Sequence, residues 1–293
     1  AARQAAGWTE IGNAWAELGR WDKAGDAWSR ATALDPGQGV ASYNLARALA
    51  EAGKYDEAIA RSDDYLESDA DNAAVLSIKA YALHKSGRDD EAITVYERVV
   101  RLNGEDSASV FNLAALMEKA GRTEEALARY DELLRLKPED PAASYRKGAL
   151  LAAAGDAAGA VPFLERYVAA NADSKAGRME LAIAQERAGL YMAALETYAA
   201  VTAKDAADAV AWFEIARLRL TVAQDGPGGI EALKKALESG FSDRGRAAEL
   251  IEAPDLVSAD EVKAMLDETG LLDGTMPADA DDSSAGGTAV DGQ

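Results

Sequence analysis

The chain has 293 residues, and its 51 acidic and 31 basic side chains give a formal charge of −20. The absence of cysteine excludes disulfides, thiolate catalysis and cysteine metal sites. No block of Lys and Arg supplies the basic surface that nucleic acids or anionic membranes attract, and no apolar run is long enough for membrane insertion. We therefore expect partners that are neutral or basic proteins.

A period of 34 residues runs through most of the chain. Six glycines are spaced by this period, and an alanine follows each of them five positions later. A period of 34 fits two short antiparallel helices and their turns. The glycines are Gly19, Gly53, Gly87, Gly121, Gly155 and Gly189, and the alanines are Ala24, Ala58, Ala92, Ala126, Ala160 and Ala194.

Residues 1–4 are predicted to be an N-terminal extension that precedes seven repeats. In each repeat, helix A covers roughly positions 1–14 and helix B roughly positions 17–30. Small residues at positions 8 and 20 let the two helices approach, and glycine at position 15 ends helix A. Position 4 is polar in three repeats (Ser42, Ser144 and Arg178), which predicts looser local packing. The repeats are 5–38, 39–72, 73–106, 107–140, 141–174, 175–208 and 209–242, the last with one inserted residue.

Residues 243–272 are predicted to form capping helices with a polar face. A helical array needs such a cap because its last repeat would otherwise expose an apolar surface. Ser258 is predicted to be the N-cap of one helix, with Glu261 completing a capping box. Residues 273–293 contain five aspartates and no basic residue, so this acidic tail is predicted to be disordered.

The repeat resembles the tetratricopeptide repeat (TPR) family, and the resemblance covers about four-fifths of the chain. It implies an all-α right-handed superhelix, an α-solenoid, whose concave groove binds a protein or peptide without catalysis or a cofactor. The residues of the first repeat that carry the family signature are Trp8, Ile11, Gly12, Trp15, Ala24, Trp28, Ala31 and Pro36.

In this family, helix A positions 2, 5, 6, 9, 12 and 13 line the groove. Aromatic side chains there give large contact area, and amides can hydrogen-bond a peptide backbone. At these positions, bases outnumber acids in the third to fifth repeats (Lys85, Lys119 and Arg146 against Glu118). This count predicts a mid-groove seat for an acidic or carboxylate-bearing peptide, and the acidic tail would compete for it. The predicted contacts are Asn13, Tyr43, Asn44, Arg47, Tyr81, His84, Lys85, Phe111, Asn112, Lys119, Tyr145, Arg146, Met179, Phe213 and Arg217.

Motifs for catalysis or metal binding are incomplete. His84 is the single histidine, and no cysteine accompanies it, so it is predicted to be a groove or surface residue. The glycine-rich run 225–229 lacks a preceding strand and the GK[ST] of a phosphate loop. Asn13 and Asn44 match two positions of the clamp that some family members use for chaperone tails. Ala74 and Ile78 stand at that clamp's basic positions, which disfavours this partner.

Four of the five tryptophans (Trp8, Trp15, Trp21 and Trp28) fall in the first repeat. They predict either a heavily packed repeat or an apolar end that contacts another chain. Two further functions stay open. One is a structural subunit of an envelope or transport assembly, including one that self-associates. The other is a small-molecule or lipid carrier, with space beside Ala16, Ala50 and Ala152. Because the sequence begins at Ala1, an exported protein without its signal peptide is slightly favoured over a cytoplasmic one.

Overall fold

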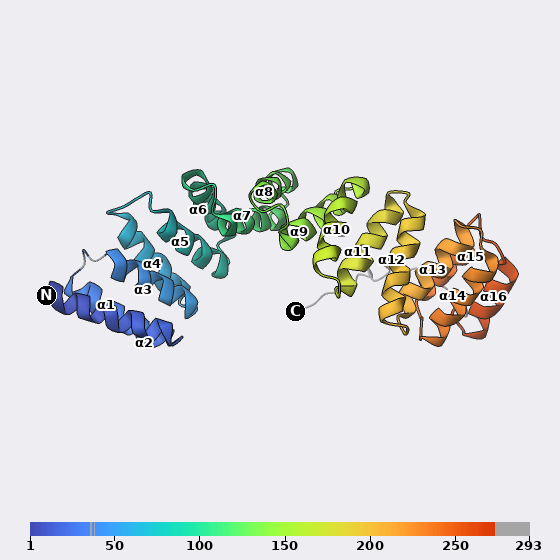
Figure 1. The fold of residues 1–293 in the computed structure, drawn as a ribbon, viewed down its shortest axis with the longest axis horizontal. Coiled ribbons are helices and arrows are strands. Elements are labelled where there is room, and N and C mark those ends of the chain that lie inside the picture. Colours follow the sequence, from blue (N-terminus) through green and yellow to red (C-terminus); the bar gives the residue numbers. More distant parts are fainter. Residues whose placement is uncertain (36, 38, 273–293) are drawn as a thin grey trace, which may run out of the picture. The chain divides into compact units, whose positions relative to one another are not determined.

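The computed structural model describes residues 1–35, 37 and 39–272, and the predicted acidic tail lies outside them. The described residues form sixteen α-helices and no strand, which confirms the predicted all-α class (Figure 1). They group into two compact units, residues 1–172 and the residues from Asp173 onward. Within the described part of the chain, none of the helices combines the length and apolar character needed to cross a membrane.

The first unit consists of five helix pairs, each made of a helix A and the helix B that follows it. Its first helix begins at Ala2, so most of the predicted extension, residues 1–4, belongs to this helix. The pairs are α1 (Ala2–Glu17) with α2 (Trp21–Leu34), α3 (Gly39–Glu51) with α4 (Tyr55–Leu66), α5 (Ala73–Lys85) with α6 (Asp89–Leu102), α7 (Ser107–Lys119) with α8 (Thr123–Leu136), and α9 (Pro141–Ala153) with α10 (Ala157–Ala170).

The second unit contains two further pairs and two shorter helices. The two shorter helices bury Leu250, Val262 and Leu266 against Leu220 and Leu233 of the last pair. This packing covers the apolar surface at the end of the array, as a cap does. The pairs are α11 (Lys175–Arg187) with α12 (Tyr191–Lys204) and α13 (Ala209–Thr221) with α14 (Gly226–Glu238), and the shorter helices are α15 (Arg244–Ile251) and α16 (Ala259–Glu268).

The repeating glycines and alanines have the predicted conformations. All six glycines adopt positive φ, from 68° at Gly19 to 91° at Gly155, which a residue without a Cβ does at little cost. The alanine that follows each glycine by five positions is fully buried. The 34-residue period therefore marks the turn between helices A and B and the point where the two helices touch.

Ser258 precedes α16 as predicted, but the predicted capping box does not form. Its φ is 56°, a left-handed value, and its side chain makes no capping hydrogen bond. The hydroxyl instead lies against the first turn of α14, where a Cβ placed on Gly226 would come within 2.6 Å of Ser258 Oγ. The contact between the cap and α14 overrides the local capping preference.

The buried side chains of the first unit form two clusters. One is built around Trp28 from α2 and α3, with Trp8 and Trp15 partly buried against it. The other extends from α3 to α9 and includes Tyr96 and Tyr130. The boundary between these clusters lies at α3, and the cleft described below lies beside that helix.

Candidate functional site

The predicted groove residues of the first unit lie on one side of its A helices, here called the helix-A face. Two of these A helices, α3 and α5, contact each other directly. Most of the predicted side chains are at least partly accessible from solvent. Those that are half-buried are Asn13, Tyr43, Asn44, Tyr81, His84, Phe111, Asn112 and Tyr145, and those that are exposed are Arg47, Lys85, Lys119 and Arg146.

An amide network joins the first two A helices. Asn44 Nδ2 donates to Asn13 Oδ1 over 3.1 Å, and Trp28 Nε1 lies 3.2 Å from the same oxygen. Trp28 Nε1 is also 3.2 Å from the backbone oxygen of Thr9. Asn13 is thus held by the protein itself. Among the described residues, the side-chain oxygen of Asn44 has no partner, so it can accept a hydrogen bond from a ligand.

A carboxylate from helix B enters the middle of the helix-A face. Asp89, the first residue of α6, lies 2.6 Å from Lys119 Nζ and 2.8 Å from His84 Nδ1. These hydrogen bonds, from Lys119 first and then His84, hold the pKa of the Asp89 carboxyl below its ordinary value. Lys85 lies 5.5 Å from the centre of the Tyr81 ring and, within the described chain, has no carboxylate partner.

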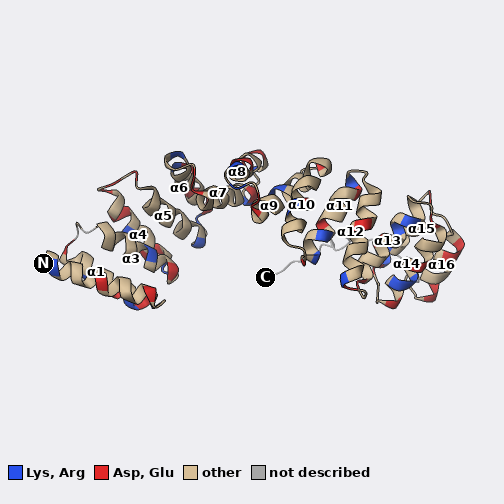
Figure 2. Ribbon diagram, viewed as in Figure 1, with Lys and Arg blue, Asp and Glu red and all other residues tan. Residues whose placement is uncertain are grey.

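Glu118 neutralises a second predicted cation. Its carboxylate lies 3.3 Å from Arg146 Nη1 and accepts a hydrogen bond of 2.8 Å from the Tyr130 hydroxyl. Burial, reinforced by Glu118, raises the pKa of Tyr130 well above its usual range. Acidic and basic residues are interspersed along the helices (Figure 2). The charge count at groove positions therefore overstates the basic character of the mid-groove, because it omits Asp89.

The remaining groove residues of this unit connect A helices to B helices. Asn112 Nδ2 donates to the Tyr96 hydroxyl over 3.2 Å. Phe111 meets Tyr130 edge-on, with ring centres 6.1 Å apart. Tyr145 and Tyr167 pack with ring centres 4.7 Å apart. These contacts fix the side chains in place and leave part of each A-helix side chain exposed.

In the second unit, the prediction for Phe213 is corrected. Its side chain is fully buried, stacked on Phe241 with ring centres 4.0 Å apart, and the Arg246 guanidinium lies 5.2 Å from its ring. A side chain without exposed surface cannot contact a partner. Phe241, between α14 and α15, and Arg246, in the capping helix α15, cover this position. Met179 is half-buried, and Arg217 is paired with two carboxylates, Glu186 at 2.5 Å and Glu214 at 2.7 Å.

The first helix pair exposes an aromatic surface in which cations lie over the rings. Ile11 and Leu18 of the same region are 43% and 69% exposed, so the surface is partly apolar. The three tryptophans predicted to form an interface end are half-buried, not covered. Their cation partners are Arg30 at 4.6 Å from Trp8, Lys23 at 4.4 Å from Trp15 and Arg47 at 5.2 Å from Trp21.

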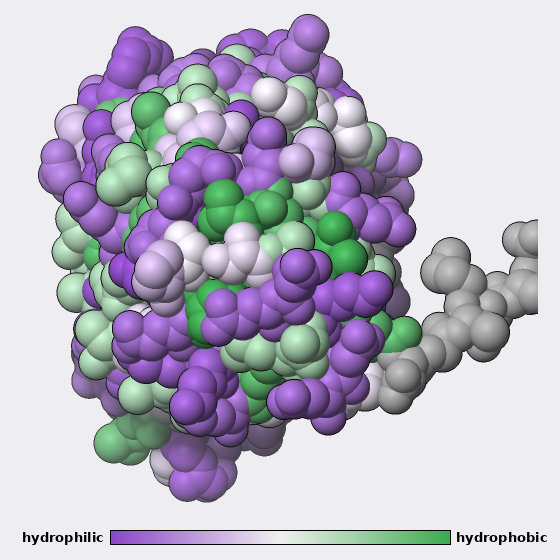
Figure 3. Space-filling view, turned by 90° about the vertical axis from the view of Figure 1, so that its right-hand side faces the viewer, coloured by the Kyte–Doolittle hydropathy of each residue, from purple (hydrophilic) through white to green (hydrophobic). Residues whose placement is uncertain are grey.

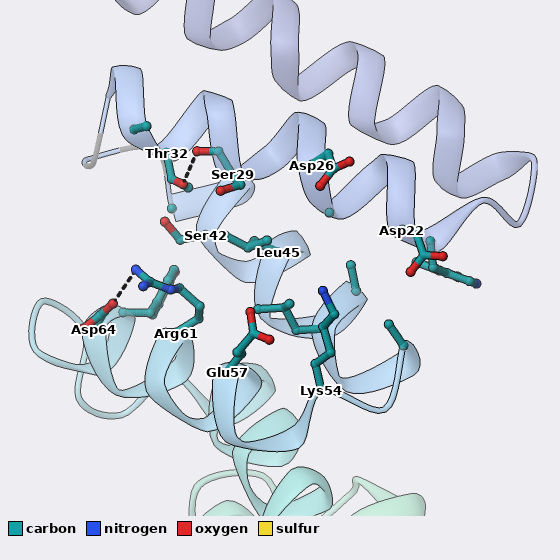
Figure 4. A pocket seen from close by; sticks show the side chains of 18 of the residues that line it. Asp22, Asp26, Ser29, Thr32, Ser42, Leu45, Lys54, Glu57, Arg61 and Asp64 are labelled. Carbon is teal, nitrogen blue, oxygen red and sulfur yellow. Dashed lines mark hydrogen bonds and ion pairs between the residues drawn. The ribbon is translucent and has the colours of Figure 1, made fainter.

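One cavity in the described part of the chain was not predicted. It is a cleft of about 1080 Å³ between α2 and α4, with α3 as its floor, here called the α2–α4 cleft (Figure 4). Asp22, Asp26 and Ser29 line the α2 wall, and Ser42 and Leu45 lie on the floor. Ser42, one of the three residues at which looser packing was predicted, lines this cleft, whereas Ser144 is fully buried.

A sequence signal for this cleft exists at repeat positions 21 and 28. The first repeat has Gly25 and Thr32 there, and a Cβ placed on Gly25 would meet only Ala48, at 3.9 Å. Later repeats carry larger aliphatic side chains at these positions, and five of them (Ile59, Ile93, Val100, Leu134 and Val161) are buried. The residues of the later repeats are Ile59, Ile93, Leu127, Val161 and Leu195 at position 21, and Leu66, Val100, Leu134 and Val168, followed by Thr202, at position 28.

Together, these helix pairs define an α-solenoid of two-helix repeats. A model of the tetratricopeptide repeat family matches residues 43–107 and 112–175. The matched residues, which make up less than half of the chain, are similar to tetratricopeptide repeats. A search of curated protein sequences gives no significant match.

Solved structures with the same fold share little sequence with this chain. The crystal structure of YrrB, described as a TPR protein with an unusual peptide-binding site, is 19% identical, with a TM-score of 0.57 over 64% of this chain and 96% of that one. The crystal structure of MamA is 19% identical, with a TM-score of 0.54 over 57% and 92%. A tetratricopeptide repeat protein from Parabacteroides merdae is 15% identical, with a TM-score of 0.57 over 89% and 99%. These similarities establish the fold alone.

Proposed function

We propose that the chain is a non-enzymatic scaffold that binds a segment of a partner protein on its helix-A face. The observation that carries this proposal is the set of reachable aromatic and amide side chains on adjoining A helices, above all Tyr43, Asn44 and Tyr81. Tyrosines offer large contact area with few rotatable bonds, and the helices hold them in place before binding. The peptide-binding site named for YrrB is in keeping with such a role.

The partner segment is selected by shape and hydrogen bonding more than by charge. Lys119 and Arg146 are already paired within the protein, which leaves Lys85 as the mid-face cation for a ligand carboxylate. Of the predicted site for an acidic peptide, one salt bridge therefore remains, from Lys85 beside the Tyr81 ring to a ligand carboxylate. An exposed ion pair of this kind contributes about 0–1 kcal/mol, so it adjusts affinity without setting it.

The test is affinity capture from a lysate of the source organism with wild type and a Tyr43→Ala/Asn44→Ala/Tyr81→Ala variant. Circular dichroism must show equal helix content for the two proteins. We expect one or more partners to be captured by the wild type and lost with the variant. The identified partner is then divided into overlapping peptides, and their affinities are measured by calorimetry to locate the bound segment.

A matched control removes exposed apolar side chains from B helices of the same unit. Leu102 and Leu136 are 44% and 39% exposed, so Leu102→Ala/Leu136→Ala changes a comparable surface away from the helix-A face. This control is expected to retain the partner. If the partner stays bound to the helix-A variant and leaves with the control, the helix-A face is not the binding site.

The first helix pair supports a second candidate function, self-association. Exposed Ile11 lies among the half-buried Trp8 and Trp15, and contiguous apolar surface of this kind favours contact with another chain. Sedimentation of wild type and Ile11→Lys over a range of concentrations tests this candidate. A mass that rises with concentration only in the wild type supports it, and a constant monomer mass in both refutes it.

A further inference from the structure

We propose that the α2–α4 cleft is a second binding surface, for a basic amphipathic helix of a partner protein. The cleft lies apart from the helix-A face on the same helix. On α3, Ser42, Leu45 and Leu49 face the cleft, whereas Tyr43, Asn44 and Arg47 belong to the helix-A face. At 100° per residue, the mean directions of the two sets differ by about 170°. One repeat could therefore hold two partners at once.

The shape of the cleft fits a helix lying parallel to its walls. The α2 wall runs from Asp22 to Ala33, a length of about 16 Å at 1.5 Å per residue, which corresponds to about three helical turns. The walls are two helices (Figure 4), and the small residues Gly25 and Ser29 on α2 leave the space between them unfilled. Leu49, which is half-buried on α3, offers apolar contact between them.

The hydrogen-bonding groups of the walls also favour a helix over an extended segment. An extended segment would need partners for its own backbone groups inside the cleft. The hydroxyls of Thr32 and Ser68 already donate to their own helix backbones, to the Ser29 and Tyr65 oxygens at 3.0 and 2.9 Å. A helix satisfies its backbone internally and presents only side chains.

The charge of the cleft selects basic side chains. Five acids line it against two bases, Lys54 and Arg61, and Arg61 is paired with Asp64 at 2.8 Å. Asp22 and Asp26, one helical turn apart on α2, have no ion-pair partner among the described residues. The acids are Asp22, Asp26, Glu57, Asp64 and Glu67. Lys or Arg along one edge of the bound helix would pair with the α2 wall.

A polar lining also distinguishes this cleft from a small-molecule site. Pockets for small ligands are mostly apolar and have volumes of about 300–1,000 Å³. Here charged and hydroxyl side chains make up much of both walls, and the volume of about 1080 Å³ lies above that range. Figure 3 views a different part of the molecule, the right-hand side of Figure 1 with α15 and α16, where hydrophilic side chains surround small apolar areas. No apolar enclosure suited to a lipid chain is formed by the α2–α4 cleft.

The experiment uses a displayed library of helical 14-residue peptides with randomised faces, selected against the full chain. A filled variant, Gly25→Leu/Thr32→Leu, restores the aliphatic side chains that most later repeats carry and serves for counter-selection. Gly7→Leu is the matched control, because Gly7 is an exposed helical glycine with no atom near its missing side chain. We expect enriched peptides to carry Lys or Arg beside an apolar stripe.

Binding is then measured by fluorescence anisotropy with labelled copies of the enriched peptides. The filled variant should weaken binding by about tenfold or more, since the apolar stripe loses its seat, and Gly7→Leu should not change it. Asp22→Lys/Asp26→Lys should weaken binding similarly, and raising salt from about 50 to about 300 mM should weaken it in the wild type. The Tyr43→Ala/Asn44→Ala/Tyr81→Ala variant should bind these peptides normally, which separates this proposal from that for the helix-A face.

Several outcomes would overturn the proposal. They are the absence of enriched helices, enrichment of acidic sequences, and peptides that bind the filled variant as well as the wild type. A small molecule that co-purifies with the wild type in native mass spectrometry and is lost from the filled variant would assign the cleft to a different ligand. Circular dichroism must show that the filled variant is folded, and its added aliphatic groups are expected to preserve or raise its stability.

Discussion

Two junctions of the first unit have the same helix order and different interiors. Around α6, α7 and α8, Ile93 and Val100 are 4% and 8% exposed and belong to the continuous core. Around α2, α3 and α4, the equivalent residues are Gly25 and Thr32, and a cleft remains. The repeat frame thus determines which helices pair. The side chains at positions 21 and 28 of helix B determine whether the next repeat packs against it without a cleft.

The largest effect is expected from removing a buried aliphatic side chain from the junction of α6, α7 and α8. Ile93→Gly removes a buried side chain and places glycine inside α6. Loss of the buried aliphatic group and of helix propensity together should lower the free energy of unfolding by about 4 kcal/mol. Urea denaturation followed by circular dichroism measures this change. A loss below about 1 kcal/mol would show that position 21 does not hold the repeats together.

A second prediction concerns position 8, where most repeats have alanine and the first has Gly12. A Cβ at Gly12 would come within 2.4 Å of Trp28 Nε1. Gly12→Ala should therefore destabilise the protein by about 2 kcal/mol, although alanine favours helix formation.

Ala46→Gly provides the opposite control at the same position of the next repeat. It should cost about 1 kcal/mol through propensity and lost packing, without a steric clash. Replacing Trp28 with phenylalanine should relieve part of the penalty of Gly12→Ala, because the crowded ring atoms belong to the indole. Unchanged or increased stability of Gly12→Ala alone would contradict the steric argument.

The fold could be predicted from the sequence because each repeat has the same residue types at the positions that determine its turn and its helix contact. Positive φ at Gly19 and the burial of Ala24 depend on neighbours within the repeat, and both follow from the period. The prediction for Phe213 is wrong because Phe241 and Arg246, which cover it, come from the segment that follows its helix pair. The capping box at Ser258 failed for the same reason, namely a contact with another helix.

The site was predictable only in part. Side chains on the helix-A face follow from their repeat positions, whereas their charge balance depends on Asp89, which reaches them from helix B. The α2–α4 cleft was missed because it results from side chains that are absent at Gly25 and Thr32. Comparing the size of residues at every repeat position, and not only at signature positions, would have indicated it.

Filling the open junction is the third prediction. Gly25→Leu should raise the free energy of unfolding by about 1.5 kcal/mol, of which about 1 comes from helix propensity and the rest from burial against Ala48 and Leu45. Gly7→Leu, at an exposed site, should give the propensity gain alone. Equal gains in the two variants, measured by urea denaturation, would show that the Gly25 side of the cleft is too open to bury a side chain.

The smallest expected effect tests the charge arrangement that the sequence count missed. Asp89→Asn removes the carboxylate held by Lys119 and His84, so it should lower the free energy of unfolding by about 0.5–1 kcal/mol at neutral pH. The pKa of Asp89 is lower in the folded state than its ordinary value of 3.8. The ionised carboxylate is therefore favoured by folding, and its contribution is fully present above pH 3.8 and declines as the pH falls through the folded-state pKa. The stabilities of wild type and Asp89→Asn should converge in strong acid.

The control for this prediction is Asp90→Asn, which changes the adjacent exposed aspartate. It should show a smaller difference at neutral pH, since Lys119 and His84 bond Asp89 and not Asp90. A difference for Asp89→Asn that grows on acidification would reverse the sign of this linkage and show that the ion pairs do not favour the folded state.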